Sequence, residues 1–121
     1  MKPTGPTNII IRRLIRTLKK IARKHKAKAW LRVAEELEKP KRRRVAVNLS
    51  KINRYANDGD FIIVPGKVLG IGSIEGKKLT IAALSASLKA LSKLKSAGCQ
   101  FFTLEEAIRV NPEARNVKLI V

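Results

Sequence analysis

The stretch Asp60–Gly72, DFIIVPGKVLGIG, decides how the rest of the chain is interpreted. Its apolar residues are interrupted by Pro65-Gly66, and Lys67 follows directly. Proline presets φ for the first central position of a tight turn, and glycine tolerates the positive φ that the second position of a type II turn requires. We therefore expect two short strands, Phe61–Val64 and Lys67–Leu69, joined by a basic turn.

The spacing of the glycines in this stretch is similar to two phosphate-binding sequence motifs but matches neither. The dinucleotide fingerprint places two residues before its third glycine, but three residues separate Gly72 from Gly76. A P-loop places four residues between its glycines and then Gly-Lys-Ser/Thr, whereas Lys77 is followed by Lys78. Turn and bulge glycines in a small sheet account for the pattern better, so we expect no cofactor.

The composition predicts one soluble and strongly basic domain. Among 121 residues, 27 Lys and Arg oppose 9 Asp and Glu, which gives a net charge of +18. A compact fold with this charge needs a polyanion or salt as counter-charge. The single cysteine, Cys99, excludes an internal disulfide and a cysteine-based metal cluster, and the single histidine, His25, argues against most zinc sites and catalytic dyads. Neither a membrane-spanning run nor a signal-peptide core is recognisable, so we expect a cytoplasmic protein.

The positive charge is concentrated near the N-terminus. Residues 1–44 carry 16 basic and 3 acidic side chains, whereas residues 45–121 carry 11 and 6. We expect residues 1–44 to form a basic arm and two helices that pack on a compact α/β core at residues 45–121, within one structural domain.

The first expected helix is cationic and amphipathic, and Thr7 or Asn8 is suited to cap it after an arm at Met1–Pro6. Its apolar stripe consists of Ile11, Leu14, Ile15, Leu18, Ile21 and Ala22. Its other faces carry Arg12, Arg13, Arg16, Lys19, Lys20, Arg23 and Lys24. Membrane-surface helices usually add Trp or Phe to the apolar face, and a merely solvated face usually mixes charges of both signs. We therefore favour contact with a polyanion.

A second helix is expected over Lys26–Lys39, with Trp30 on its apolar stripe and Pro40 ending it. Trp30 is interpreted as a core anchor rather than a base-stacking residue. Four cations then follow in a loop, Lys41-Arg42-Arg43-Arg44. Such a run can be a solvated tether or a nuclear-import signal, but its continuity with the basic helices favours phosphate contact, which the planar fork of arginine suits.

The remainder alternates strands and helices. We expect a strand at Val45–Val47, a short helix capped by Asn48, and a turn at Asn57-Asp58-Gly59. Asp58 and Asp60 serve that turn better than a catalytic pair, because no histidine or third carboxylate is near in the sequence.

Further strands are expected at Leu79–Ala83, Cys99–Phe102 and Val117–Val121. Between them lie a helix at Ala86–Ala97, capped by Ser85 with Leu88, Leu91 and Leu94 facing inward, and a helix opened by the capping box Thr103–Glu106. Gly98 is suited to end the first of these helices. The fold class is therefore α/β (α+β mixed), in which a basic helical region precedes a small mixed sheet with β-α-β crossovers.

Three motifs resemble a known family. They are Arg44 with the VNLSKI core at Val47–Ile52, VPGKVLG at Val64–Gly70, and the run Lys77–Gly98. In this order the chain resembles, along its whole length, the archaeal and eukaryotic large-subunit ribosomal protein numbered eighteen-e, whose bacterial counterpart is protein fifteen. Its length is similar to that of archaeal members. The chain departs from the family at Cys99, where a second glycine often stands.

The resemblance implies a structural component of the large ribosomal subunit, without catalytic or metal-binding residues, that binds 23S-type ribosomal RNA and neighbouring ribosomal proteins but no membrane or small-molecule substrate. The candidate RNA-binding residues are Arg12, Arg13, Arg16, Lys19, Lys20, Arg23, Lys41, Arg42, Arg43, Arg44, Asn48, Lys51, Arg54, Gly66, Lys67, Lys77 and Lys78. The alternative is a free-standing basic protein that packages nucleic acid, which should bind duplex DNA as readily as structured RNA.

Overall fold

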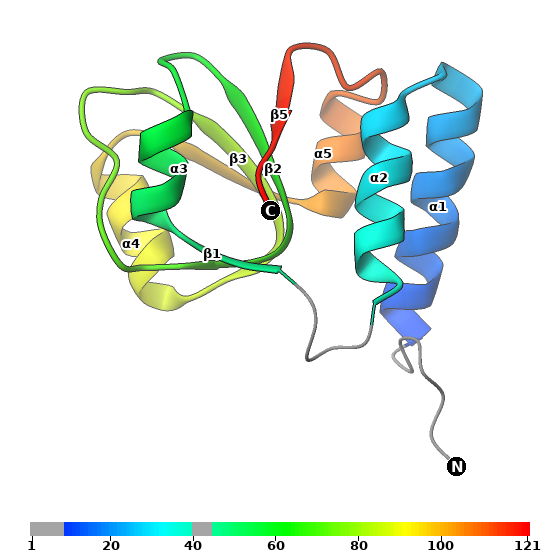
Figure 1. Ribbon diagram of the computed structural model, residues 1–121, viewed down its shortest axis with the longest axis horizontal. Coiled ribbons are helices and arrows are strands. Elements are labelled where there is room, and N and C mark those ends of the chain that lie inside the picture. The colour runs from blue at the N-terminus through cyan, green and yellow to red at the C-terminus, as the bar shows by residue number, and fades with distance from the viewer. Residues whose placement is uncertain (1–8, 40–44) are drawn as a thin grey trace.

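A computed structural model describes residues 9–39 and 45–121 (Figure 1). The predicted arm at Met1–Pro6, the cap at Thr7 or Asn8, the stop at Pro40 and the basic run at Lys41, Arg42, Arg43 and Arg44 lie outside the described residues. The described elements are α1 (Ile9–His25), α2 (Lys28–Leu37), β1 (Val45–Asn48), α3 (Leu49–Tyr55), β2 (Phe61–Leu69), β3 (Thr80–Ala86), α4 (Leu88–Ser96), β4 (Gln100–Thr103), α5 (Leu104–Val110) and β5 (Val117–Leu119).

The five-stranded sheet is centred on β2 and confirms the α/β class. Its strand order is β1-β2-β3-β4, and β5 also pairs with β2. β5 pairs with Phe61–Ile63 and β1 with Gly66–Leu69, so these two strands follow one another along the same edge of β2. All the pairings of the described strands are parallel, so the sheet is not mixed as the sequence led us to expect.

The predicted turn at Pro65-Gly66 is wrong, because β2 runs through both residues without reversing. Val64 pairs with Ala83 and Lys67 with Ser85, so two residues of β2 stand opposite one residue of β3. This is a β-bulge, a position where proline, which has no N–H to donate, is tolerated within a sheet. Gly66 does not have a positive φ. A glycine is needed there because a Cβ atom would overlap the backbone oxygen of Val45 in β1.

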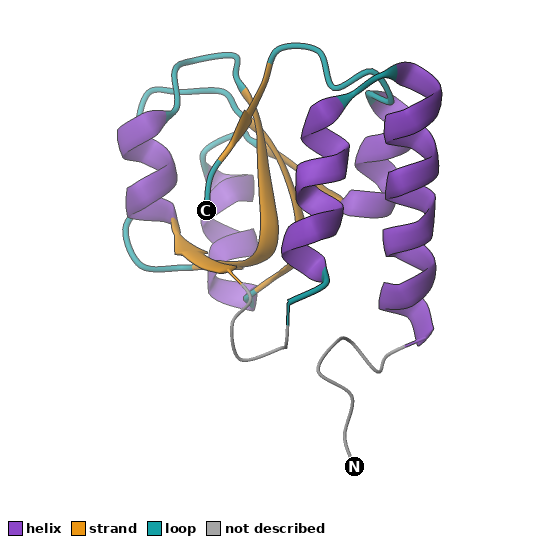
Figure 2. Ribbon diagram, turned by 45° about the vertical axis from the view of Figure 1, so that its right-hand side comes forward, coloured by secondary structure: helices purple, strands orange, loops and turns teal. Residues whose placement is uncertain are grey.

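Helices cover both faces of the sheet, as Figures 1 and 2 show. α1, α2 and α5 bury one apolar cluster against the first face, and this cluster includes Leu18, Trp30 and Ile63. α3 and α4 bury a second cluster against the other face, with Ile52 and Leu94 among its members. The chain therefore has three layers, and α1 and α3 lie on opposite sides of the sheet.

Several local predictions are confirmed. The buried residues of α1 are Leu14, Ile15, Leu18 and Ala22, all on the predicted stripe. Trp30 is fully buried, and its indole N–H donates to the backbone oxygen of Asn111 at 3.1 Å, so it anchors the core. The capping box of α5 is formed, since the Thr103 hydroxyl accepts from the N–H of Glu106 and the Glu106 carboxylate accepts from the N–H of Thr103.

Other boundaries differ from the prediction. Ser85 pairs within β3, so α4 begins later and is capped by Ser87, whose hydroxyl accepts from the N–H of Ala90 at 3.1 Å. In this helix Ala90 and Leu94 are buried, whereas Leu88 is 85% exposed and does not face inward. α2 starts only at Lys28, after a corner at which Lys26 has a φ of 55°.

Candidate nucleic-acid interface

The outer face of α1 is a row of exposed cations. Arg13, Arg16, Lys20, Arg23 and Lys24 are exposed and form no salt bridge within the described part of the chain. At 100° per residue they lie opposite the buried stripe, and they extend over roughly 16 Å along the helix axis. Burial of that stripe fixes the direction of the whole row, so this face, called the α1 cationic face below, is a rigid array of positive charge.

The remaining two predicted cations of α1 flank this face. Arg12 is exposed, and Lys19 is partly buried. The ammonium of Lys19 pairs with the carboxylate of Glu38, just beyond α2, at 3.1 Å. Lys19 therefore helps to join the two helices and is less available to an external anion than the residues of the α1 cationic face.

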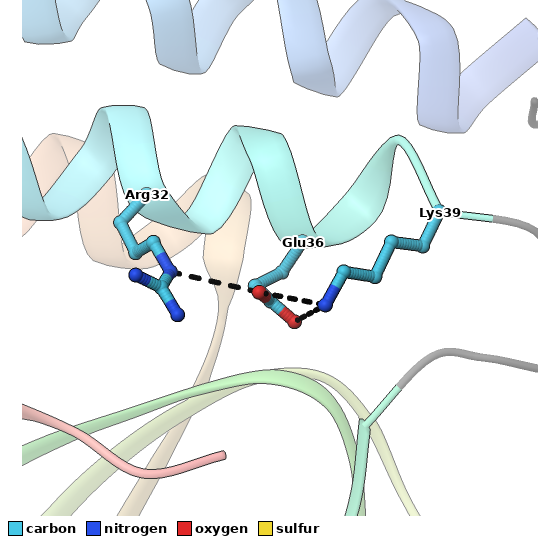
Figure 3. Close-up of polar contacts among 3 residues, drawn as sticks. All are labelled: Arg32, Glu36 and Lys39. Atoms are coloured by element: carbon cyan, nitrogen blue, oxygen red, sulfur yellow. Dashed lines mark hydrogen bonds and ion pairs between the residues drawn. The ribbon is translucent and has the colours of Figure 1, made fainter.

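The acidic side chains of the helical region lie on α2 and its end, where Glu36 and Glu38 form internal ion pairs. Glu36 is the one buried charged residue that the structure describes, and it lies between Arg32 of α2 and Lys39, just beyond the end of that helix (Figure 3). Its carboxylate accepts from the Lys39 ammonium at 2.9 Å and lies 3.5 Å from Nε of Arg32. A buried carboxylate is tolerated only when cations compensate it, so Arg32 and Lys39 balance Glu36, and the α1 cationic face keeps its full charge.

Most of the predicted residues that the structure describes outside α1 are used inside the protein. The Asn48 side-chain oxygen accepts from the N–H of Ile71 at 3.2 Å and does not cap α3, contrary to the prediction. The ammonium groups of Lys51, Lys77 and Lys78 donate to the backbone oxygens of Val121, Asn53 and Ala97. These three lysines hold separate segments of the fold together. Arg54 and Lys67, in contrast, are exposed and form no salt bridge among the described residues.

The glycines after β2 serve close packing. Gly72 has a φ of 88° and lies against Ser50, where a Cβ atom would come within 2.6 Å of the Ser50 Cβ. A Cβ atom on Gly70 would likewise come within 2.8 Å of the Lys89 Cγ at the start of α4. The Lys93 ammonium donates to the backbone oxygens of Gly70 and Gly72 at 2.8 and 2.7 Å. The loop thus offers its carbonyl oxygens to a cation of the same chain, which is the opposite of a phosphate-binding loop.

Asp60 shapes the turn after α3, as predicted, whereas Asp58 joins that turn to the segment before β3. Asp58 accepts from the N–H of Lys78 at 2.6 Å. Asp60 accepts from the N–H of Asn57 at 2.7 Å and pairs with the Lys118 ammonium at 2.8 Å. The hydrogen bond from Lys118, followed by that from Asn57, holds the pKa of the Asp60 carboxyl below its ordinary value of 3.8. Within the described residues, no group of three or more His, Cys, Asp and Glu is placed to hold a metal ion.

The predicted residues therefore form one continuous surface, the α1 cationic face. Arg54 and Lys67 are exposed separately, since Arg54 lies on α3 and Lys67 lies within the sheet between Ala46 and Ser85. Sequence reasoning missed Lys93 and Lys118, because their partners lie 21 to 63 residues away along the chain and no local pattern marks them. No described helix is long and apolar enough to cross a membrane.

Comparison with known proteins gives matches along nearly the whole chain. The large ribosomal subunit protein eL18 of Pyrobaculum aerophilum is 44% identical over 119 residues, which cover 98% of this chain and 97% of the relative. Proteins of the same name from Thermoplasma volcanium and Methanococcus maripaludis are 45% and 42% identical, and cover 88% and 99% of this chain. These matches cover 86% and 99% of the relatives. No protein-family model matches the chain.

Proposed function

Because the chain belongs to the eL18 family of large ribosomal subunit proteins, we propose that ribosomal RNA holds it in the subunit through the α1 cationic face. The observation that carries this proposal is the row Arg13, Arg16, Lys20, Arg23 and Lys24, exposed and without internal salt bridges among the described residues. Membership of this family also supports a role in the cytoplasmic ribosome as a structural protein rather than an enzyme.

Binding is driven by charge. Each lysine or arginine that meets a phosphate releases condensed counter-ions from the RNA, so affinity falls steeply as salt is added. Because its net charge is +18, the free protein attracts any polyanion without selectivity. Selectivity for one RNA site then comes from the fixed spacing of the cations on α1, which suits only certain arrangements of phosphates.

Arg54 and Lys67 form further, weaker contacts. Arg54 lies on α3, across the sheet from α1, whereas Lys67 lies between β1 and β3 and alternates with Val68 of the α3–α4 cluster, so it faces the other side of the sheet. Through Arg54 and the α1 cationic face, one protein molecule contacts RNA in two directions. Lys41, Arg42, Arg43 and Arg44 remain proposed RNA contacts, although they lie outside the described residues. Asn48, Lys51, Gly66, Lys77 and Lys78 act mainly by shaping the fold. Neighbouring ribosomal proteins cover part of the less charged C-terminal half, and neither a membrane nor a small-molecule substrate is among the proposed partners.

The proposal is tested by competition. The purified chain is bound to archaeal large-subunit ribosomal RNA over a salt series, and duplex DNA of equal phosphate content is added as competitor. We expect the RNA to be preferred and the affinity to fall with salt. Equal competition by the DNA would instead support the free-standing packaging protein. Sedimentation of a cell lysate gives the second measurement, because a chain that is absent from the large subunit contradicts the proposal.

A further inference from the structure

A concave site lies where the end of α3 meets β5. Its volume is about 440 Å³, and its lining residues are Lys51, Tyr55, Lys118, Leu119, Ile120 and Val121. α3 and β5 lie beside each other in both views of the molecule (Figures 1 and 2). We call this site the Tyr55 pocket. One of its walls is apolar, and no acidic residue is among those that line it.

Tyr55 differs from the other aromatic residues of the chain. It is 55% exposed, whereas Trp30 is fully buried. Phe61, Phe101 and Phe102 pack against the two apolar clusters. Tyr55 is therefore the one aromatic side chain with a largely free surface, and an exposed ring next to cations is the arrangement by which proteins hold unstacked bases.

Hydrogen bonds hold the walls of the pocket in place. The Lys118 ammonium donates to the backbone oxygen of Tyr55 at 3.2 Å and pairs with Asp60 at 2.8 Å. Lys51, one helical turn before Tyr55, donates to the backbone oxygen of Val121. These bonds connect the last turn of α3 to β5 and the residues after it. The ring of Tyr55 is thus presented by a fixed backbone, which lowers the entropy lost when a ligand binds.

We propose that the Tyr55 pocket receives one unpaired nucleotide of RNA. The base stacks on the ring of Tyr55 beside the apolar wall of Leu119–Val121. The exposed ring carries this assignment, because the Lys118 ammonium is paired with Asp60 and the Lys51 ammonium bonds to Val121. The net charge of +18 supplies the general attraction for RNA. An aromatic face accepts any base, so the pocket recognises an unpaired position rather than a sequence. This inference rests on the proposed binding of RNA.

The test compares two RNA probes. One is a short single-stranded oligo(A) that contains a fluorescent adenine analogue, and the other is a blunt RNA duplex with the same number of phosphates. The variants are Tyr55→Leu, which removes the ring, and Tyr55→Phe, which keeps it. Leu88→Ala is the matched control, because Leu88 is 85% exposed and lies outside the pocket. Thermal unfolding of each variant confirms that the fold is retained.

We expect Tyr55→Leu to weaken single-strand binding by about tenfold, a typical effect of one lost stacking contact. It should also abolish the quenching of the analogue, while duplex binding stays unchanged. Tyr55→Phe and Leu88→Ala should behave like the unaltered protein. Unchanged affinity and quenching in Tyr55→Leu, or an equal loss for both probes, would overturn the pocket assignment and leave the α1 proposal intact. If the unaltered protein binds neither RNA probe, both the pocket assignment and the α1 proposal are contradicted.

Discussion

Gly66 in β2 lies directly against the backbone oxygen of Val45 in β1, so close that a Cβ atom at position 66 would overlap that oxygen. The two strands pair at this point, and Val45 is the register partner of Gly66. Any side chain at position 66 must therefore push β1 away from the central strand. The requirement for glycine comes from the neighbouring strand and not from the local φ angle.

Gly66→Ala should consequently destabilise the protein by about 1–3 kcal/mol, the usual cost of overpacking a well-packed site. Gly76→Ala is the control, since Gly76 has a φ of 66° and nothing within 4 Å of its added Cβ. That change costs only backbone strain, about 1 kcal/mol. Urea unfolding measures both variants. Equal stability of Gly66→Ala and the unaltered protein would show that β1 does not pack as described.

The α1 cationic face should dominate the salt dependence of RNA binding. Replacing Arg13, Arg16 and Lys20 together with Ala should lower the salt slope by about three units, one for each lost phosphate contact. Stability should change little, because each exposed substitution typically shifts the free energy of unfolding by less than about 0.5 kcal/mol. The control replaces Lys89, Lys95 and Arg115, which removes the same charge elsewhere. If the control lowers the slope equally, binding is not centred on α1.

Lys93 should stabilise the glycine loop. Its ammonium donates to the backbone oxygens of both Gly70 and Gly72, and Lys93→Met removes these bonds while keeping most of the aliphatic chain. We expect a loss of about 1–3 kcal/mol, because two backbone acceptors lose a charged donor. Lys95→Met, on the exposed side of the same helix, should leave the denaturant midpoint nearly unchanged. If the two variants have similar denaturant midpoints, water replaces the hydrogen bonds of Lys93 without loss of stability.

Asp60 should contribute to acid sensitivity. Since its pKa is lower in the folded protein than its ordinary value of 3.8, the ionised carboxylate stabilises the fold above that pH. The contribution is lost as the pH falls through the folded pKa. Asp60→Asn should therefore make stability less dependent on pH below about 3.8. Lys118→Met should do the same, and the two changes together should add little, because both break one ion pair. Fully additive effects would contradict this coupling.

The sequence predicts best those features that depend on neighbouring residues. The apolar stripe of α1 follows from helical periodicity, and the capping box at Thr103–Glu106 needs only four consecutive residues. Pro65-Gly66 shows the limit of such reasoning. A Pro-Gly pair is suited to a tight turn and also to a bulge, and the choice depends on whether another strand, here β3, lies alongside.

The candidate site divides in the same way. That α1 presents cations opposite its buried stripe could be predicted, because one helix carries both patterns. That Lys51, Lys77 and Lys78 are used internally could not, since their acceptors are 70, 24 and 19 residues away. A lysine at the surface and a lysine that bonds a distant carbonyl have the same local sequence context.

The shared edge of β2 has a consequence for the order in which the chain folds. On that edge, β5 pairs with Phe61–Ile63, and β5 is the last strand in the sequence. The earlier strand β1 pairs with Gly66–Leu69. During synthesis the backbone N–H and C=O groups on that edge of Phe61–Ile63 therefore stay unpaired until residues 117–119 have been made. Such long-range parallel pairing slows folding and leaves the unfinished chain prone to association, so capture of the strongly basic N-terminal helices by RNA before synthesis ends would hold the nascent protein apart from other copies.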